Sequence, residues 1–391
     1  MAKRVGIEVS RAVAVAAKLA DVDVVSAYPI TPQTHIVEAL AEFVAEGELR
    51  ASYIPVESEH SAMSACLGSA SVGARTFTAT ASQGLELMHE VLYVASAMRF
   101  PIVMAVANRA LSAPISIWGD HSDVMAVRDT GWIQIFTANG QEAFDTTLLA
   151  FRIAEDRRVL LPVMVHMDGF HLTHVIEPIL IEEAAEVARF LPQNQYPLPL
   201  DPDHPVSMGA FGPPNMYTEA KKAQYVALDD SKAVIEEAWR EFGDIFGRYY
   251  TPLDCYRCEG AKVIFLAMGS FSETAMNAID ALRDEGTAVG LVKLRLWRPF
   301  PFAEIRDAVK DAETLIVLDR ALSFGGPGGP VASEIRSALY GLPKRPKVVG
   351  FVGGLGGRDI TPEGFKEMIN RGVEISRTGS DQEFEMFGVR E

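Results

Sequence analysis

The 391-residue sequence contains only three cysteines, which is too few for a secreted fold built on disulfides. Basic residues are also scarce, since 36 Lys and Arg stand against 52 Asp and Glu and give a formal charge of -16. Nucleic acids and anionic membranes both attract basic surfaces, so we expect this protein to bind neither. The sequence lacks an uncharged apolar run of about 18 residues, which argues against a membrane-spanning helix. A cytoplasmic protein is therefore expected.

Hydrophobic residues make up 48% of the chain and charged residues 23%, proportions typical of a globular protein. At about 150 residues per domain, the length predicts two or three domains. Short apolar segments alternate with amphipathic helical segments over residues 9–166, and this alternation is typical of an α/β fold with a parallel sheet covered on both faces. The strands expected there are 22–28, 52–56, 76–80, 102–107, 132–136 and 160–166.

The alternation stops between residues 192 and 214, where seven prolines would interrupt either a helix or a strand. A charged helix is expected over 231–246. Alternation then resumes, with strands near 263–267, 288–294, 314–318 and 348–351. We therefore divide the chain into an α/β domain of residues 1–230, a connector of residues 231–257 and a smaller α/β domain of residues 258–391.

Three segments that follow expected strands carry side chains suited to chemistry, and an open α/β sheet binds its ligands at that edge. In the first segment, Thr31 stands between Pro29 and Pro32, and its hydroxyl would either contact a ligand or cap the next helix. In the second segment, Glu57 and Glu59 precede a helix rich in small residues. From the residues alone, we favour helix capping for this pair over a proton-handling role in a cleft.

The third segment ends a buried strand at Arg109, whose guanidinium needs an anion. A structural salt bridge and a bidentate contact with a substrate carboxylate are equally favoured. The following loop, residues 119–123, brings Asp120, His121 and Asp123 together. We favour substrate-side hydrogen bonding or loop closure over metal binding there, because a fourth ligand is lacking nearby.

Residues 78–84 could hold an anion or a cofactor ring through backbone N–H groups, although they match neither a P-loop nor a dinucleotide-binding pattern. The glycine-rich runs 325–330 and 353–357 miss both patterns too, and tight turns explain them equally well. Cys255 and Cys258 form a CxxC pair, but a zinc or iron–sulfur site needs about four ligands. We favour two cysteines without a role over a redox dithiol.

Five motifs occur in order: Tyr-Pro-Ile-Thr-Pro at 28–32, Val-Glu-Ser-Glu-His at 56–60, Thr-Ala-Ser-Gln-Gly at 80–84, Asn-Arg-Ala at 108–110 and Gly-Asp-His-Ser-Asp at 119–123. Together they resemble the α subunit of the 2-oxoacid:ferredoxin oxidoreductases, most of all the pyruvate:ferredoxin oxidoreductases, and the resemblance covers nearly the whole chain. It implies a larger parallel-sheet domain of the pyrimidine type found in thiamine-diphosphate enzymes. It also implies a smaller α/β domain similar to the C-terminal domain of transketolase.

Enzymes of this family decarboxylate a 2-oxoacid on thiamine diphosphate, and the resemblance assigns cofactor contacts to the motif residues. Glu59 takes the place of the acid that hydrogen-bonds the pyrimidine ring of the cofactor, which overturns the preference for capping. Glu57 is the second choice for this role. Pro29, Ile30 and Gln83 are implied to bind the cofactor as well.

The same resemblance implies that Arg109 holds the carboxylate of the substrate and that the hydroxyl of Thr31 contacts the substrate. Asp120 and His121 are implied to lie on the substrate side of the site. Glu59, Thr31 and Arg109 are thus the expected catalytic residues, and no residue is expected to bind a metal.

The implied reaction is the oxidative decarboxylation of pyruvate with coenzyme A to acetyl-CoA and CO2, or its reverse, with electrons passing through [4Fe–4S] clusters to ferredoxin. The sequence lacks the Gly-Asp-Gly…Asn signature of thiamine diphosphate and magnesium. The resemblance therefore implies a β subunit that holds the diphosphate and Mg²⁺, γ- and δ-type subunits, and clusters on partner chains. A branched-chain 2-oxoacid, phenylglyoxylate or oxalate is the alternative substrate. A non-catalytic assembly subunit and a self-sufficient nucleotide-binding protein are the alternatives of another class.

Overall fold

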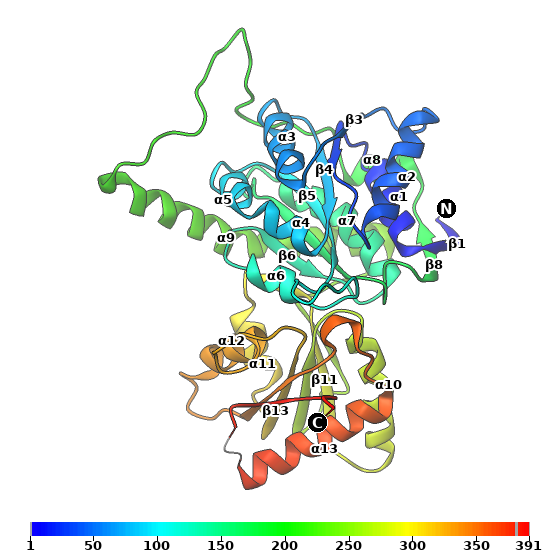
Figure 1. The fold of residues 1–391 in the computed structure, drawn as a ribbon, viewed down its shortest axis with the longest axis vertical. Helices are drawn as coiled ribbons and strands as arrows, with labels where there is room; N and C mark the ends of the chain where they lie inside the picture. The colour runs from blue at the N-terminus through cyan, green and yellow to red at the C-terminus, as the bar shows by residue number, and fades with distance from the viewer. Residues whose placement is uncertain (1, 380–381, 391) are drawn as a thin grey trace.

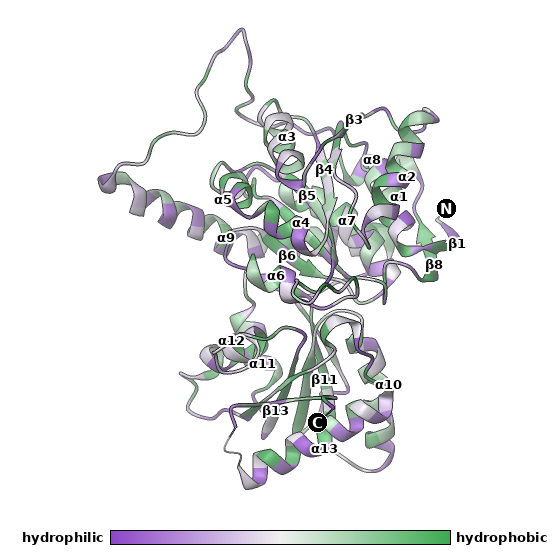
Figure 2. Cartoon of the chain, viewed as in Figure 1, coloured by the Kyte–Doolittle hydropathy of each residue, from purple (hydrophilic) through white to green (hydrophobic). Residues whose placement is uncertain are grey.

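The computed structural model describes residues 2–379 and 382–390, which form two α/β bodies that lie one above the other in Figure 1. The upper body is built on a seven-stranded sheet and the lower body on a six-stranded sheet. Figure 2 shows that the strands inside both bodies are hydrophobic, whereas the outer faces of the long helices are hydrophilic. Within the described residues, no helix combines the length and the apolar character needed to cross a membrane.

The seven-stranded sheet has the order β12-β6-β7-β5-β4-β2-β3, and all its strands except β12 run parallel. Its strands are β2 (Val24–Ala27), β3 (Ser52–Pro55), β4 (Thr76–Thr80), β5 (Ile102–Asn108), β6 (Ile133–Phe136), β7 (Val163–Asp168) and β12 (Leu296–Arg298). Six of them coincide with the apolar segments predicted from the sequence, although β5 extends one residue and β7 two residues beyond the predicted end. The seventh, β12, comes from far along the chain and ties the second half of the sequence to the first sheet.

Helices cover both faces of this sheet, as the alternation predicts. One face packs against α1 (Val9–Leu19), α2 (Thr34–Ala45), α7 (Gly140–Ala154), α8 (Ala184–Phe190) and α9 (Pro214–Phe246). The other face packs against α3 (Glu59–Ser71), α4 (Ser82–Leu87) and α5 (His89–Ala97). Strand β5 lies between them, so Val103 and Ala105 belong to one core while Met104 and Val106 belong to the other.

The six-stranded sheet has the order β15-β14-β13-β10-β11-β9, and only β9 runs antiparallel to its neighbour. Its strands are β9 (Leu253–Tyr256), β10 (Val263–Ala267), β11 (Val289–Leu294), β13 (Thr314–Asp319), β14 (Lys347–Val352) and β15 (Phe384–Met386). Helices α11 (Phe302–Ala308) and α12 (Pro330–Leu339) cover one face, and α10 (Phe271–Asp284) and α13 (Pro362–Thr378) cover the other. A short 3-10 turn, η1 (Leu355–Gly357), follows β14.

The structure departs from the sequence prediction at its periphery. Strands β1 (Lys3–Glu8) and β8 (Ile176–Ile181) form a separate antiparallel pair that was not predicted. Helix α6 (Ser122–Ala126) was not predicted either. Between β4 and β5 the chain forms two helices in succession, α4 and α5, which meet at Met88.

Helix α9 begins at Pro214 and not near residue 231, so the expected domain boundary at residue 230 falls inside a helix. The first half of α9 is almost entirely exposed, and its regular burial starts only at Ala227. Without a buried stripe, the first half shows no helical apolar period that the sequence could reveal. The proline-rich stretch before α9 forms no helix or strand, and it projects far from the upper body in Figure 1.

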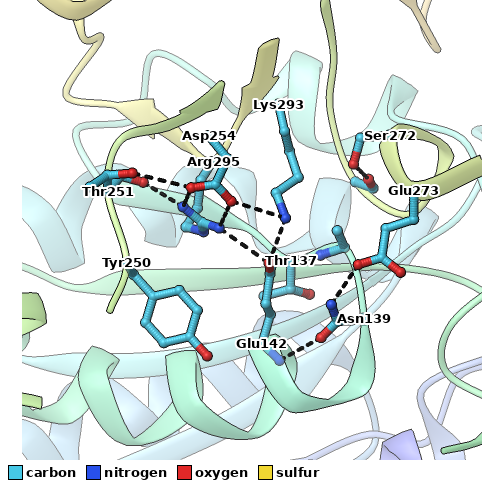
Figure 3. A network of polar contacts seen from close by, with 12 residues as sticks. Thr137, Asn139, Glu142, Tyr250, Thr251, Asp254, Ser272, Glu273, Lys293 and Arg295 are labelled. Carbon is cyan, nitrogen blue, oxygen red and sulfur yellow. Dashed lines mark hydrogen bonds and ion pairs between the residues drawn. The ribbon is translucent and has the colours of Figure 1, made fainter. Parts of the chain in front are cut away.

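A charged cluster joins the two bodies where β9 and β11 meet α7, as Figure 3 shows. Glu142 of α7 accepts hydrogen bonds from Lys293 Nζ at 2.6 Å and from Arg295 Nη2 at 3.1 Å. Asp254 of β9 forms ion pairs with the same two cations. Burial alone would raise the pKa of Glu142, but Arg295 and Lys293 hold it below its ordinary value. The contact between the bodies is therefore partly ionic, with Glu142 and Arg295 buried and Asp254 partly exposed.

We predict that the two halves of α9 contribute very differently to stability. Phe242 is fully buried and its ring packs 5.4 Å from that of Phe190, so Phe242→Ala should lower the free energy of unfolding by about 3–5 kcal/mol. Met216, in the projecting half, is 60% exposed, and Met216→Ala should change it by no more than about 0.5 kcal/mol. Urea denaturation of both variants checks this. Equal losses would mean that the projecting half is as strongly anchored as the buried half.

Candidate active site

The residues singled out from the sequence converge on one edge of the upper sheet. Strands β5, β4, β2 and β3 are neighbours in this order and run parallel, so their carboxyl ends meet at the same edge. The segments that follow these strands contain Arg109, Gln83, Thr31 and Glu59, respectively. An open parallel sheet binds its ligands at this edge, so the arrangement defines a candidate active site.

The loop after β2 is fixed to the end of β4 by one buried side chain. Gln33 donates its amide hydrogens to the carbonyl oxygens of Ala79 at 2.6 Å and of Tyr28 at 3.3 Å. Pro29 and Thr31 remain exposed in this loop, and Ile30 is half-buried. Helix α2 begins at Thr34 after Gln33, so Thr31 does not cap it. The Thr31 side chain therefore stays free to contact a ligand.

The carboxyl group of Glu59 is buried and is not used for capping. Ser58 occupies the N-cap position of α3 and accepts a hydrogen bond from the Ser61 backbone at 3.2 Å. Glu59 is only 6% exposed, and in the described part of the chain its carboxyl group has no hydrogen-bond partner. Glu57 is exposed instead, and a hydrogen bond from the Ser61 hydroxyl at 2.5 Å lowers its pKa. The buried acid of the pair is therefore Glu59.

Gly84 in the first turn of α4 leaves the room that Glu59 occupies. A Cβ atom at residue 84 would lie 2.7 Å from Oε1 of Glu59 and 2.5 Å from Oγ1 of Thr80, closer than real contacts allow. The hydroxyl of Thr80 is itself buried, with no hydrogen-bond partner in the part of the chain that the structure describes. Gln83 lies in the same turn, half-buried, and accepts a hydrogen bond from the Ser82 hydroxyl at 2.7 Å. The polar groups of Glu59 and Thr80 thus both border the space beside Gly84, which carries no side chain.

Arg109 is a buried cation without an ion pair among the described residues. Its guanidinium donates to the carbonyl oxygens of Ser116 at 2.8 Å and of Thr31 at 2.9 Å, and it is 7% exposed. Burial lowers the pKa of Arg109, and the charge of Asp123 partly opposes this effect. The structural salt bridge considered from the sequence does not form in this part of the chain. An anion that reaches the guanidinium would therefore give Arg109 the counter-charge that the described residues do not supply.

Asp123 is a positioning residue that the sequence analysis missed. Its Oδ2 accepts the backbone N–H groups of Ser82 at 3.1 Å and Arg109 at 2.9 Å, while Oδ1 accepts the side-chain amide of Asn108 at 2.9 Å. The side chain is fully buried, and burial raises its pKa to about 7. Asp123 thereby joins the segments after β4 and β5. The sequence shows an acid in the motif, but it does not show that this acid bridges two distant loops.

Asp120 and His121 face the second body. Asp120 accepts the backbone N–H of Gly356 at 3.0 Å, and His121 Nε2 hydrogen-bonds Asp168 at 2.9 Å. Arg320, from the loop after β13, forms an ion pair with Asp168 and donates to the carbonyl oxygen of Gly119 at 2.7 Å. Burial lowers the pKa of His121, against the pull of Asp168. Both residues already have partners in this chain, and their contact with a substrate stays a prediction.

Comparison with known proteins shows which family this chain belongs to. Residues 15–240 match the family described as "Pyruvate flavodoxin/ferredoxin oxidoreductase, thiamine diP-bdg", and residues 261–365 match "Pyruvate:ferredoxin oxidoreductase core domain II". Pyruvate synthase subunit PorA of Methanothermobacter thermautotrophicus is 53% identical, with 93% of this chain and 94% of the relative covered. The same subunit of Thermotoga maritima is 46% identical, with 100% and 99% covered. Ketoisovalerate oxidoreductase subunit VorA of Pyrococcus horikoshii is 42% identical, with 97% and 96% covered.

Two solved structures share the fold. The 2-oxoglutarate:ferredoxin oxidoreductase of Magnetococcus marinus superimposes with a TM-score of 0.72 at 20% identity, covering 95% of this chain and 65% of that one. A split-gene transketolase superimposes with a TM-score of 0.54 at 13% identity, covering 95% and 100%. These likenesses and the parallel sheets confirm the fold class predicted from the sequence. With both domain matches and relatives of this identity, the chain belongs to the pyruvate:ferredoxin oxidoreductase family, including its thiamine-diphosphate-binding domain.

Proposed function

We propose that this chain is the α-type subunit of a pyruvate synthase and supplies the pyrimidine side of its thiamine diphosphate site. The complete enzyme oxidises pyruvate with coenzyme A to acetyl-CoA and CO2, passing electrons to ferredoxin, or runs in reverse. The observation that carries the proposal is the Glu59 side chain, 6% exposed and without a hydrogen-bond partner among the described residues, at the same sheet edge as the Arg109 guanidinium, which has no ion pair among them. Relatives named pyruvate synthase subunit PorA, 44% to 53% identical, support the choice of reaction.

The residues around Glu59 fit a polar aromatic ring. When bound, thiamine diphosphate supplies the nucleophilic carbon and the electron sink for decarboxylation. Glu59 would hold its pyrimidine ring by a hydrogen bond to a ring nitrogen, which satisfies a carboxyl group that has no partner in the described chain. Pro29 and Ile30, from the loop after β2, and Gln83, from the first turn of α4, would line the cofactor.

The substrate would bind on the Arg109 side. A guanidinium offers a planar fork that suits a carboxylate, and the carbonyl oxygens of Ser116 and Thr31 already fix its orientation. The exposed Thr31 hydroxyl would contact the same substrate. Asp120 and His121 would lie on the substrate side of the site as well, next to the second body.

The remaining parts of the enzyme would come from partner chains. A [4Fe–4S] cluster needs four thiolates, and this sequence has three cysteines in all. We place the clusters on γ- and δ-type subunits that serve ferredoxin, and the diphosphate and Mg²⁺ on a β subunit. The complex would work in the cytoplasm, and its three cysteines are all free in this structure, without a structural disulfide.

A branched-chain 2-oxoacid is the second candidate substrate. It is favoured by the relative named ketoisovalerate oxidoreductase subunit VorA, which is 42% identical. The higher identity to several PorA subunits favours pyruvate. Assaying the reconstituted complex with a panel of 2-oxoacids separates the two.

For the central proposal, we predict that Glu59→Gln lowers kcat for pyruvate-dependent viologen reduction by the assembled complex by about 10²- to 10⁴-fold. The amide keeps the size of the side chain but not its acid function. Glu57→Gln is the matched control, because that carboxylate is exposed two residues away, and it should retain near wild-type activity. Size-exclusion chromatography establishes that both complexes assemble. A fully active, assembled Glu59→Gln complex would favour an assembly subunit without catalytic residues.

The space at Gly84 gives a second test of the same acid. Gly84→Ala places a methyl group against Glu59 and Thr80, so we expect the carboxyl group to move and kcat to fall at least about tenfold. Gly68→Ala in α3 is the control, because a Cβ there meets nothing within 4 Å. Melting temperatures of both variants separate a displaced acid from a destabilised fold. Equal activity in the two variants would contradict the placement of Glu59 in the site.

For Arg109, we expect the main effect on substrate binding. Losing a buried charge pair costs about 2–4 kcal/mol, so Arg109→Ala should raise KM for pyruvate by about 30- to 900-fold where substrate release outpaces chemistry. Arg109→Lys keeps the charge but loses the fork, and its KM should lie in between. Steady-state kinetics of both variants give the answer. A KM unchanged in Arg109→Ala would restrict this residue to holding the Thr31 and Ser116 loops.

A further inference from the structure

The CxxC pair lies on an edge strand, away from the candidate active site. Cys255 is exposed in β9, at the edge of the six-stranded sheet, and Cys258 follows β9 half-buried. The Sγ of Cys258 lies 3.2 Å from the carbonyl oxygen of Leu291 on the neighbouring strand β11. One sulfur is thus open to solvent while the other is packed against the sheet.

A rigid turn holds the two cysteines in place. Arg257 between them adopts a left-handed backbone conformation with φ of 51°. Gly290 of β11 lets the turn approach closely, because a Cβ there would lie 2.8 Å from both the Arg257 carbonyl oxygen and the Cα of Cys258. Arg283 donates to the carbonyl oxygens of Arg257 at 2.5 Å and of Glu259 at 3.1 Å. The turn is therefore preorganised and not a loose loop.

The two cysteines stand at the two ends of this turn, separated by two residues. The single S–H of Cys258 donates to the carbonyl oxygen of Leu291 at 3.2 Å. The neighbouring Cys258 thiol lowers the pKa of Cys255 to about 7, although burial and the acids Asp254 and Asp307 oppose this. Cys255 in turn raises the pKa of Cys258, with Arg283 acting weakly against it. An exposed sulfur with thiolate character beside a protonated one is the arrangement of an attacking and a resolving thiol.

We propose that Cys255 and Cys258 form a reversible redox dithiol that exchanges with external low-molecular-weight disulfides. The Cys255 thiolate attacks one sulfur of the disulfide, whose S–S bond breaks and releases one thiol. Cys258 then loses its proton and attacks the Cys255 sulfur of the mixed disulfide, which releases the second thiol. The chain gives up two electrons and two protons, and the external disulfide becomes two thiols.

Oxidised glutathione is the probe for this exchange on the full-length chain. Intact-mass spectrometry should show that wild type loses two hydrogen atoms and accumulates little glutathione adduct. Dithiothreitol should reverse the change. Cys258→Ala should retain glutathione as a stable mixed disulfide, at least about tenfold more than wild type, because the resolving thiol is gone. Cys255→Ala should acquire almost none.

Alkylation by iodoacetamide gives an independent measure. The pH profile of Cys255 labelling should have its midpoint near 7 in wild type and move upward in Cys258→Ala, because the neighbouring thiol that lowers the pKa of Cys255 is removed. Cys66 serves as the internal control, because burial raises the pKa of its thiol to about 12 and it should stay unlabelled in the folded chain. The proposal is overturned if wild type retains as much glutathione as Cys258→Ala, or if oxidation only cross-links separate chains.

Discussion

A buried ion pair between Asp168, at the end of β7, and Arg320, directly after β13, joins the two bodies of this chain. Both side chains are about 1% exposed, so water cannot replace either partner, and removing one costs about 3–5 kcal/mol. Asp168 also binds His121, which directly precedes α6, and the Asp123 carboxyl group in the first turn of α6 holds the backbone of Arg109. The contact between the bodies and the geometry of the candidate site are therefore parts of one hydrogen-bonded structure.

Much of this fold could be predicted from the sequence because its strands are buried on both faces. A strand such as β5, with every residue buried, appears as a continuous apolar run whose ends Pro101 and Arg109 mark clearly. Elements without a buried stripe could not be predicted. The first half of α9 is polar and projecting, and β1 pairs with β8 outside both main sheets. Strand β12 was missed because three residues carry too little pattern.

The candidate site could be predicted only in part, because several of its contacts depend on local geometry or join residues far apart in the sequence. The strand-end rule places Thr31, Glu59 and Arg109 at one edge without any contact being known. Ser58 caps α3, and Glu59 does not. This difference depends on local geometry that sequence spacing does not reveal. The bridge made by Asp123 spans 41 residues to Ser82, and only the folded structure brings these groups together.

Glu59 and Arg109 differ from the paired charges between the bodies, because the described chain buries them without a counter-charge. Burying an unsatisfied polar or charged group destabilises a fold, and this cost persists while the group is held in place. Arg109 is held by two carbonyl oxygens, and the glycine at 84 keeps room for Glu59. On the proposed function, a cofactor ring and a 2-oxoacid carboxylate supply the missing partners. Cofactor binding, substrate binding and the stability of the assembled complex would then all depend on Glu59 and Arg109.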